Sequence, residues 1–151
     1  MILVDSSVFV ARFRAEAGWQ RLFSPTLEEP YAVPASVLVE VGMRVRTLSL
    51  TRPVPVEVAT EDMRLLVAEI RRQAAEVVPI DADLAVAAND AFARFGKGTG
   101  HPARLNFGDC LVHAVAVRRG LPLLFKGDDF GHTDLAAHPA SQDGAGRTLL
   151  S

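Results

Sequence analysis

Two acidic side chains in the first third of the chain stand in apolar surroundings. Asp5 separates two short apolar stretches, and Glu40 lies inside the apolar run 37–41. A carboxylate in such surroundings is costly unless it is paired, hydrogen-bonded or bound to a cation. The simpler alternatives are that Asp5 caps a helix and that Glu40 pairs with Arg44 four residues later. Either residue can also serve in a functional site.

Three more acids in the last third of the chain stand next to apolar segments. Asp109 lies at the start of an apolar stretch directly after Gly108, which leaves room for a ligand or another backbone to approach. Asp128 and Asp129 follow an apolar run and a glycine. An acid in the first turn of a helix is favoured by the helix dipole, and acids are common in turns, so none of these positions is specific alone.

Taken together, the acids predict a cation site. Carboxylates brought close together repel one another, and a bound cation removes that repulsion. Ligands that are all oxygen suit Mg²⁺ or Mn²⁺. A divalent cation in such a site supports phosphodiester hydrolysis, because it activates water and stabilises charge on the phosphate oxygens.

The elements that must position these acids follow an alternating pattern. Short apolar strands are expected at 1–4, 31–33, 77–80 and 121–125, and amphipathic helices at about 8–16, 34–48, 61–77, 81–95 and 107–118. Segments 24–30, 52–55 and 96–102 are expected to be loops. This alternation predicts an α/β sandwich around a mostly parallel sheet, in which ligands bind beyond the carboxyl ends of the strands. Asp5, Asp128 and Asp129 follow strands, as that rule requires.

Length and composition narrow the class of protein. The 151 residues, 49% of them hydrophobic, predict one globular domain over 1–151, with a short irregular C-terminal tail from about residue 135. The single cysteine cannot form an internal disulfide, which favours a cytoplasmic protein, and no apolar run is long enough to span a membrane. The net charge of −2 gives no basic signature of nucleic-acid binding.

Other residues with reactive side chains have simpler interpretations. Cys110 is expected to be a small buried apolar residue, and His113 to be structural. The four histidines lack the spacing of a zinc site. The glycine-rich segment 96–100 lacks the ending of a phosphate-binding P-loop and does not follow a strand.

Four segments, in this order, resemble PIN-domain ribonucleases, and most closely the VapC-like toxins of bacterial toxin–antitoxin pairs. They are the opening segment 1–7, Glu40 in its apolar helix, Leu-Asn-Phe-Gly-Asp-Cys at 105–110 and Leu-Leu-Phe-Lys-Gly-Asp-Asp-Phe at 123–130. The resemblance implies a PIN-like three-layer α/β/α sandwich and Mg²⁺-dependent endoribonuclease activity, with Mn²⁺ as a substitute. It also implies an RNA substrate, a VapB-like antitoxin that binds the groove of the active site, and a homodimer.

The resemblance also assigns roles to individual residues. Asp5 and Asp109 would be the principal metal ligands, and Glu40 the third acid, acting on the metal directly, through water, or by orienting the attacking water. Asp128 is the expected fourth acid, with Asp129 as its substitute because the motif is compressed here. Ser7 would steady the site by hydrogen bonding.

Three alternatives belong to other classes. A haloacid-dehalogenase-like phosphatase would need a second Asp two residues after the first, where this chain has Ser7. A phospho-accepting receiver would need paired acids near the N-terminus and an acceptor Asp after a central strand, and neither is found. A non-catalytic PIN-like binding module would not be expected to retain all the acids.

Overall fold

A short parallel sheet forms the centre of the protein, for which the computed structural model describes residues 1–149. The sheet has the order β3-β2-β1-β4, and all three pairings are parallel. The register places Leu3 beside both Ala32 and Leu123. The strands are β1 (Ile2–Val4), β2 (Tyr31–Pro34), β3 (Glu76–Val78) and β4 (Leu123–Leu124). The predicted α/β class with a parallel sheet is confirmed.

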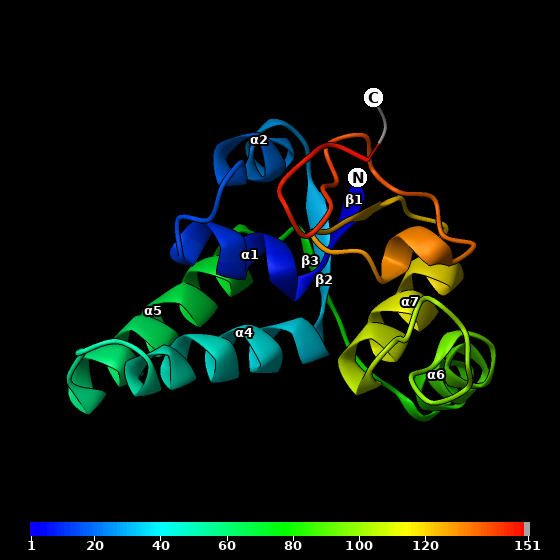
Figure 1. The fold of residues 1–151 in the computed structure, drawn as a ribbon, viewed down its shortest axis with the longest axis horizontal. Coiled ribbons are helices and arrows are strands. Elements are labelled where there is room, and N and C mark those ends of the chain that lie inside the picture. Colours follow the sequence, from blue (N-terminus) through cyan, green and yellow to red (C-terminus); the bar gives the residue numbers. More distant parts are fainter. Residues whose placement is uncertain (150–151) are drawn as a thin grey trace.

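Helices cover both faces of this sheet. In Figure 1, α1 and α5 lie on one side of the strands, and α6 and α7 lie on the other. The helices are α1 (Ser6–Phe13), α2 (Trp19–Phe23), α3 (Pro25–Glu28), α4 (Ala35–Thr47), α5 (Val56–Gln73), α6 (Ala82–Phe95) and α7 (Phe107–Arg119), with 3₁₀ turns η1 (Leu48–Leu50) and η2 (Phe130–His132). None of the helices in residues 1–149 combines the length and the apolar character needed to cross a membrane.

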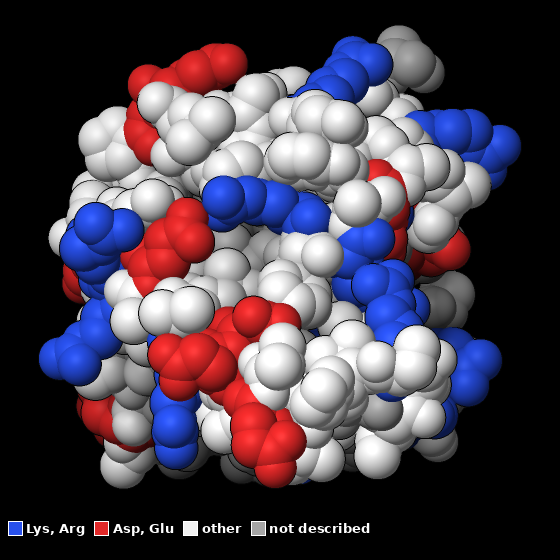
Figure 2. All heavy atoms as spheres, turned by 90° about the vertical axis from the view of Figure 1, so that its left-hand side faces the viewer, with Lys and Arg blue, Asp and Glu red and all other residues white. Residues whose placement is uncertain are grey.

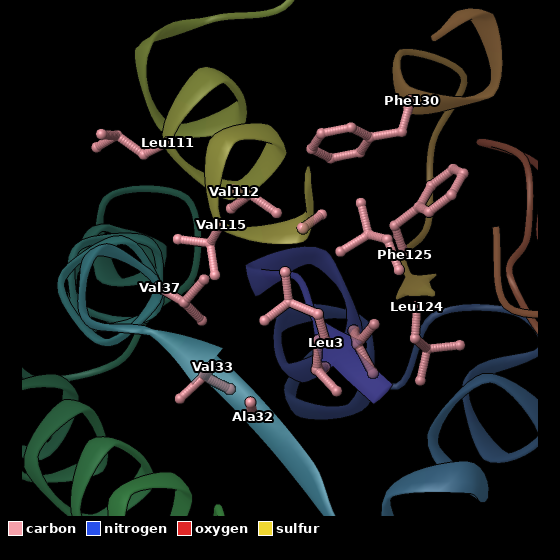
Figure 3. Close-up of a cluster of buried hydrophobic side chains, with 14 of the residues drawn as sticks. Leu3, Ala32, Val33, Val37, Leu111, Val112, Val115, Leu124, Phe125 and Phe130 are labelled. Atoms are coloured by element: carbon pink, nitrogen blue, oxygen red, sulfur yellow. The ribbon is translucent and has the colours of Figure 1, made fainter. Parts of the chain in front are cut away.

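The strands are apolar throughout because both of their faces are covered. Every residue of β1, β2 and β4 is buried, as expected for a parallel sheet between two layers of helices. Figure 3 shows Leu3 and Leu124 of adjacent strands among side chains from α4 and α7, including Val37, Val112 and Val115. This packing fixes the starts of α4 and α7 against the carboxyl edge of the sheet.

Two helical segments differ from the sequence-based expectation. The expected loop at 24–30 is wrong in part, because α3 begins at Pro25, which is tolerated in the first turn of a helix. The long helix α5 begins at Val56, five residues before the expected start at Glu61. In both places a proline precedes or opens the helix, although the pattern favoured a loop.

The chain after residue 134 packs against β4 through isolated pairings. Ala137 pairs with Leu123, and Gln142 pairs with Lys126. The Gln142 side chain is buried, and its amide donates to the Gly18 carbonyl at 2.9 Å. This segment therefore packs against β4 and the start of α2.

Candidate active site

The carboxyl edge of the sheet brings the predicted acids together from four parts of the chain. Asp5 directly follows β1, and Glu40 lies on α4, which begins immediately after β2. Asp109 lies in the first turn of α7, and the pair Asp128 and Asp129 follows β4. Figure 1 shows the starts of α1, α4 and α7 meeting below the sheet. The topology therefore places these residues on one side of the molecule.

Asp5 is held rigidly by the start of α1. It is the N-cap of that helix, and its Oδ2 accepts hydrogen bonds from both the backbone N–H of Ser7, at 2.9 Å, and the Ser7 hydroxyl. The Ser7 hydroxyl in turn accepts the backbone N–H of Lys126 at 2.9 Å. The expected capping role is thus present. Asp5 Oδ1, however, is buried and has no hydrogen-bond partner among the described residues, so one oxygen remains for another ligand.

Asp109 is positioned by a capping box at the start of α7. The Asn106 side chain accepts the N–H of Asp109 at 3.0 Å, and Asp109 Oδ2 accepts the N–H of Asn106 at 2.9 Å. These reciprocal bonds satisfy two donors of the first turn. They engage one carboxylate oxygen and hold the side chain, only 9% exposed, at the edge of the core.

Glu40 lies against the same helix start. Its Oε1 accepts from Arg44 at 3.1 Å, which is the ion pair expected from the spacing. Its Oε2 lies only 2.9 Å from the position that a β-carbon on Gly108 would occupy. The absence of a side chain at Gly108 is therefore what allows the Glu40 carboxylate to lie beside Asp109.

The pKa values of the acids reflect their proximity. The pKa of Asp109 is raised to about 7, mainly by burial and also by the charges of Asp5, Glu40 and Asp129, while the hydrogen bond from Asn106 opposes the rise. Burial also raises the pKa of Asp5, and the charge of Glu40 adds to this rise. A buried carboxylate whose pKa is raised by neighbouring negative charge is stabilised by binding either a proton or a cation. Three of the acids therefore act electrostatically on the fourth.

Asp129, rather than Asp128, is the member of the pair that acts on Asp109. Asp128 Oδ1 instead accepts the backbone N–H of Gly144 at 3.4 Å. Burial and the charge of Asp128 raise the pKa of Asp129, while Arg104 opposes that rise. The sequence did not point to Arg104, because nothing in its local pattern distinguishes it from the other arginines.

The oxygen-only donor set fits a hard divalent cation. Asp5 contributes a buried oxygen that has no hydrogen-bond partner among the described residues, and the neighbouring carboxylates add to the rise that burial causes in the pKa of Asp109. Within residues 1–149, no three His, Cys, Asp or Glu side chains are already closed around a position that could hold a metal ion. The acids are thus close enough to interact but do not form a complete coordination sphere.

The remaining reactive side chains have structural surroundings. Burial raises the pKa of the Cys110 thiol to about 11, which disfavours the thiolate that a nucleophile requires. The His113 ring is buried, and its Nε2 lies 3.0 Å from Asp134 Oδ1. Both residues match the interpretation made from the sequence.

Replacement of Gly108 by Ala tests the position of Glu40. Gly108 is helical, so Ala is expected to keep or raise the free energy of unfolding by about 0.5–1 kcal/mol. The new β-carbon would displace the Glu40 carboxylate, and we expect RNA cleavage to fall by on the order of 10-fold. Thermal unfolding and a cleavage assay measure the two effects.

The matched control is Gly131→Ala, because a β-carbon there has no atom within 4 Å. It should leave RNA cleavage nearly unchanged. Equal cleavage by Gly108→Ala and wild type would show that the place of Glu40 beside Asp109 has no role in the reaction.

The chain resembles characterised proteins over almost its whole length. Residues 2–135 match the PIN domain family. A VapC ribonuclease of Rhizobium meliloti (strain 1021) is 37% identical over 142 residues, covering 89% of this chain and 99% of the relative. Ribonuclease VapC28 of Mycobacterium tuberculosis is 58% identical over 57 residues, covering 38% of this chain and 43% of that protein.

Two solved structures share the fold. The crystal structure of Mycobacterium tuberculosis VapC20, described as a sarcin–ricin loop cleaving toxin, has a TM-score of 0.65 and 23% identity, and the match covers 90% of this chain and 97% of that one. A toxin–antitoxin complex from Klebsiella pneumoniae has a TM-score of 0.61 and 14% identity, covering 92% and 98% of the two chains.

Proposed function

The chain belongs to the PIN-domain family of VapC ribonucleases, the toxins of toxin–antitoxin pairs, and we propose that it cleaves RNA with a divalent cation held at the carboxyl edge of its sheet. The reaction is hydrolysis of RNA phosphodiester bonds. Members of this family are typically metal-dependent, and we propose Mg²⁺ as the cation, with Mn²⁺ as a substitute. The main support is that Asp5, Glu40 and Asp129, from separate segments, all raise the pKa of Asp109.

We assign the cation to Asp5 and Asp109, with Glu40 and Asp129 acting on it directly or through water. When bound, the cation activates water and neutralises charge on the phosphate oxygens. Asp5 Oδ1 is a ligand well prepared for this role, because Ser7 engages only the other oxygen. Cleavage assays in Mg²⁺, Mn²⁺ and EDTA test the assignment, since EDTA should abolish cleavage.

The other side chains orient these acids. Ser7 and Asn106 each engage one oxygen of a carboxylate and so fix the direction of the other oxygen. Glu40 is bound on one oxygen by Arg44, and its second oxygen faces Gly108. In this proposal the second oxygen would orient the attacking water and accept its proton. Fixed geometry of this kind reduces the reorganisation needed in the transition state.

We propose that Asp129 is the fourth acid, in preference to Asp128. Asp129→Asn is expected to lower RNA cleavage by on the order of 10-fold, because its charge acts on Asp109. Asp128→Asn is expected to change cleavage little, since that carboxylate binds the Gly144 backbone. The rate of cleavage at saturating Mg²⁺ measures both. The reverse ranking of the two variants would return the role to Asp128.

An antitoxin is the expected partner, and we propose that it contacts two adjoining surfaces. Its C-terminal segment would cover the acids, where an inserted Arg or Lys replaces the charge of the cation. A helix preceding that segment would occupy the apolar groove between α4 and α5. The groove is lined by Leu38, Val39, Met43, Met63 and Val67 and flanked by Arg64, Arg71 and Arg72.

The groove fits an amphipathic helix with acidic flanks, because its floor is apolar and its rim is basic. Val39 and Met43 are 62% and 64% exposed, although they are large and apolar. Co-expression with the small protein encoded by the adjacent reading frame should yield a complex without nuclease activity. Met43→Glu should weaken binding of that protein. Full nuclease activity within the complex would contradict this arrangement.

We also propose a homodimer, which light scattering during size-exclusion chromatography would detect.

A further inference from the structure

The protein as a whole carries no net positive charge that would attract RNA, so cations beside the site matter. Its net charge is −2. Figure 2 shows the face on the side of α1 and α5, where both acidic and basic side chains are exposed. Sequence-independent affinity for RNA depends on cations placed along the phosphates. A cation and an exposed ring next to the acids can supply this affinity locally.

Arg104 is the cation in that position. Its side chain is exposed, while its neighbours Ala103 and Leu105 are fully buried. Its positive charge acts on Asp129 and opposes the rise in the pKa of that acid. No ion pair within residues 1–149 involves Arg104, so its donors are available to a ligand.

The backbone at Arg104 is strained and firmly anchored. Its φ is 50°, in the left-handed region that glycine adopts far more readily than arginine. The adjoining Leu105 N–H donates to the Phe95 carbonyl at 2.9 Å, and the Leu105 carbonyl accepts from Lys97 N–H at 2.9 Å. An arginine where glycine would be less strained, on a fixed backbone beside the site, is typical of a functional position.

Phe107 is the exposed ring. It is the first residue of α7, two positions before Asp109, and it is 82% exposed. Its backbone is held by the same capping box that positions Asp109. A large apolar ring so exposed, on a rigid element at the edge of a nuclease site, has the properties of a platform for a nucleobase.

We propose that Arg104 and Phe107 form an RNA-binding subsite next to the scissile phosphate. This inference rests on the proposed function. Arg104 binds a neighbouring phosphate, and Phe107 stacks on an unpaired base, so the substrate is single-stranded or looped RNA. An antitoxin segment that brings positive charge to the acids would instead be repelled by Arg104, which favours RNA as the ligand of this pair.

The test uses variants that should fold. Arg104→Gly removes the guanidinium and relieves the strain, so its melting temperature should equal or exceed that of wild type. Its KM for a single-stranded oligoribonucleotide should rise about tenfold, and the slope of log Kd against log salt should decrease by about one. Phe107→Ala should raise KM by about tenfold, and Phe107→Tyr should restore it. Neither substitution should change how the protein distinguishes one fully paired RNA duplex from another.

Binding is measured separately by fluorescence anisotropy with the Asp5→Asn protein, so that no cleavage occurs. Arg21→Ala on α2 and Leu27→Ala on α3 are the matched controls, since Leu27 is also 73% exposed but precedes β2 at the opposite edge of the sheet. Wild-type KM and Kd in both test variants would overturn the subsite. If the Arg104 and Phe107 variants lose antitoxin binding but keep their affinity for RNA, the RNA subsite is also overturned, and the two residues contact the antitoxin instead. Failure of wild type to cleave RNA would instead contradict the proposed function, and the anisotropy would still decide the subsite.

Discussion

Asp109→Asn and Asp5→Asn are each expected to lower RNA cleavage by on the order of 100-fold or more, while the fold is retained. The amide keeps the size of the carboxylate and can still accept the hydrogen bonds that position it. It removes the negative charge, so affinity for a cation falls. Initial rates of cleavage over a range of Mg²⁺ concentrations measure the loss.

A second N-cap separates catalysis from helix capping. Asp81 caps α6 as Asp5 caps α1, and its side chain accepts the N–H of Leu84 at 2.8 Å. Asn caps helices about as well as Asp, so both Asn variants should fold. Asp81→Asn should cleave RNA at the wild-type rate. If Asp5→Asn does so too, Asp5 is a helix cap and not a ligand.

The stability of the metal-free protein should depend strongly on pH through Asp109. Its pKa is about 7 in the folded protein, raised from 3.8. Because the folded state favours the protonated carboxyl, this stabilising contribution is present below pH 3.8 and is lost as pH rises through about 7. In EDTA, the loss from this one group is up to about 4 kcal/mol of unfolding free energy.

The difference between Asp109→Asn and wild type isolates this effect. Acids with lowered pKa values, such as Asp134 and Asp143, oppose the trend but contribute equally to both proteins. Denaturant unfolding in EDTA from pH 4 to 8 should show the variant gaining relative stability as pH rises. At pH 8, Mg²⁺ should stabilise wild type much more than the variant. If the difference in unfolding free energy between the variant and wild type does not change with pH, the pKa of Asp109 is not raised in the folded protein.

Much of this site could be predicted from the sequence because its acids interrupt apolar segments. The positions of Asp5 after β1 and of Asp109 at the start of α7 followed from local patterns, and the parallel sheet brings them to one edge. The sequence favoured Asp128 over Asp129 without a physical reason to separate them, because both follow the same glycine and only the path of the turn distinguishes their positions.

Features that depend on tertiary contacts could also not be predicted from the sequence. The exposed position of Arg104 beside Asp129 depends on how residues 95–105 pair, and its positive φ contradicts the preference of arginine. The contact between Glu40 and Gly108 joins residues far apart in the chain. Gly108 suggested close approach by a ligand or another backbone, but the group that approaches it is the Glu40 side chain.

A crystal soaked in Mn²⁺ tests the central claim most directly, through the anomalous scattering of the metal. We expect an anomalous peak between Asp5 and Asp109, with Asp5 Oδ1 as a direct ligand. The same soak of Asp109→Asn should show a weaker peak or none. A peak elsewhere, or density that leaves Asp5 Oδ1 without a ligand in wild type at saturating Mn²⁺, would contradict a cation held by these acids.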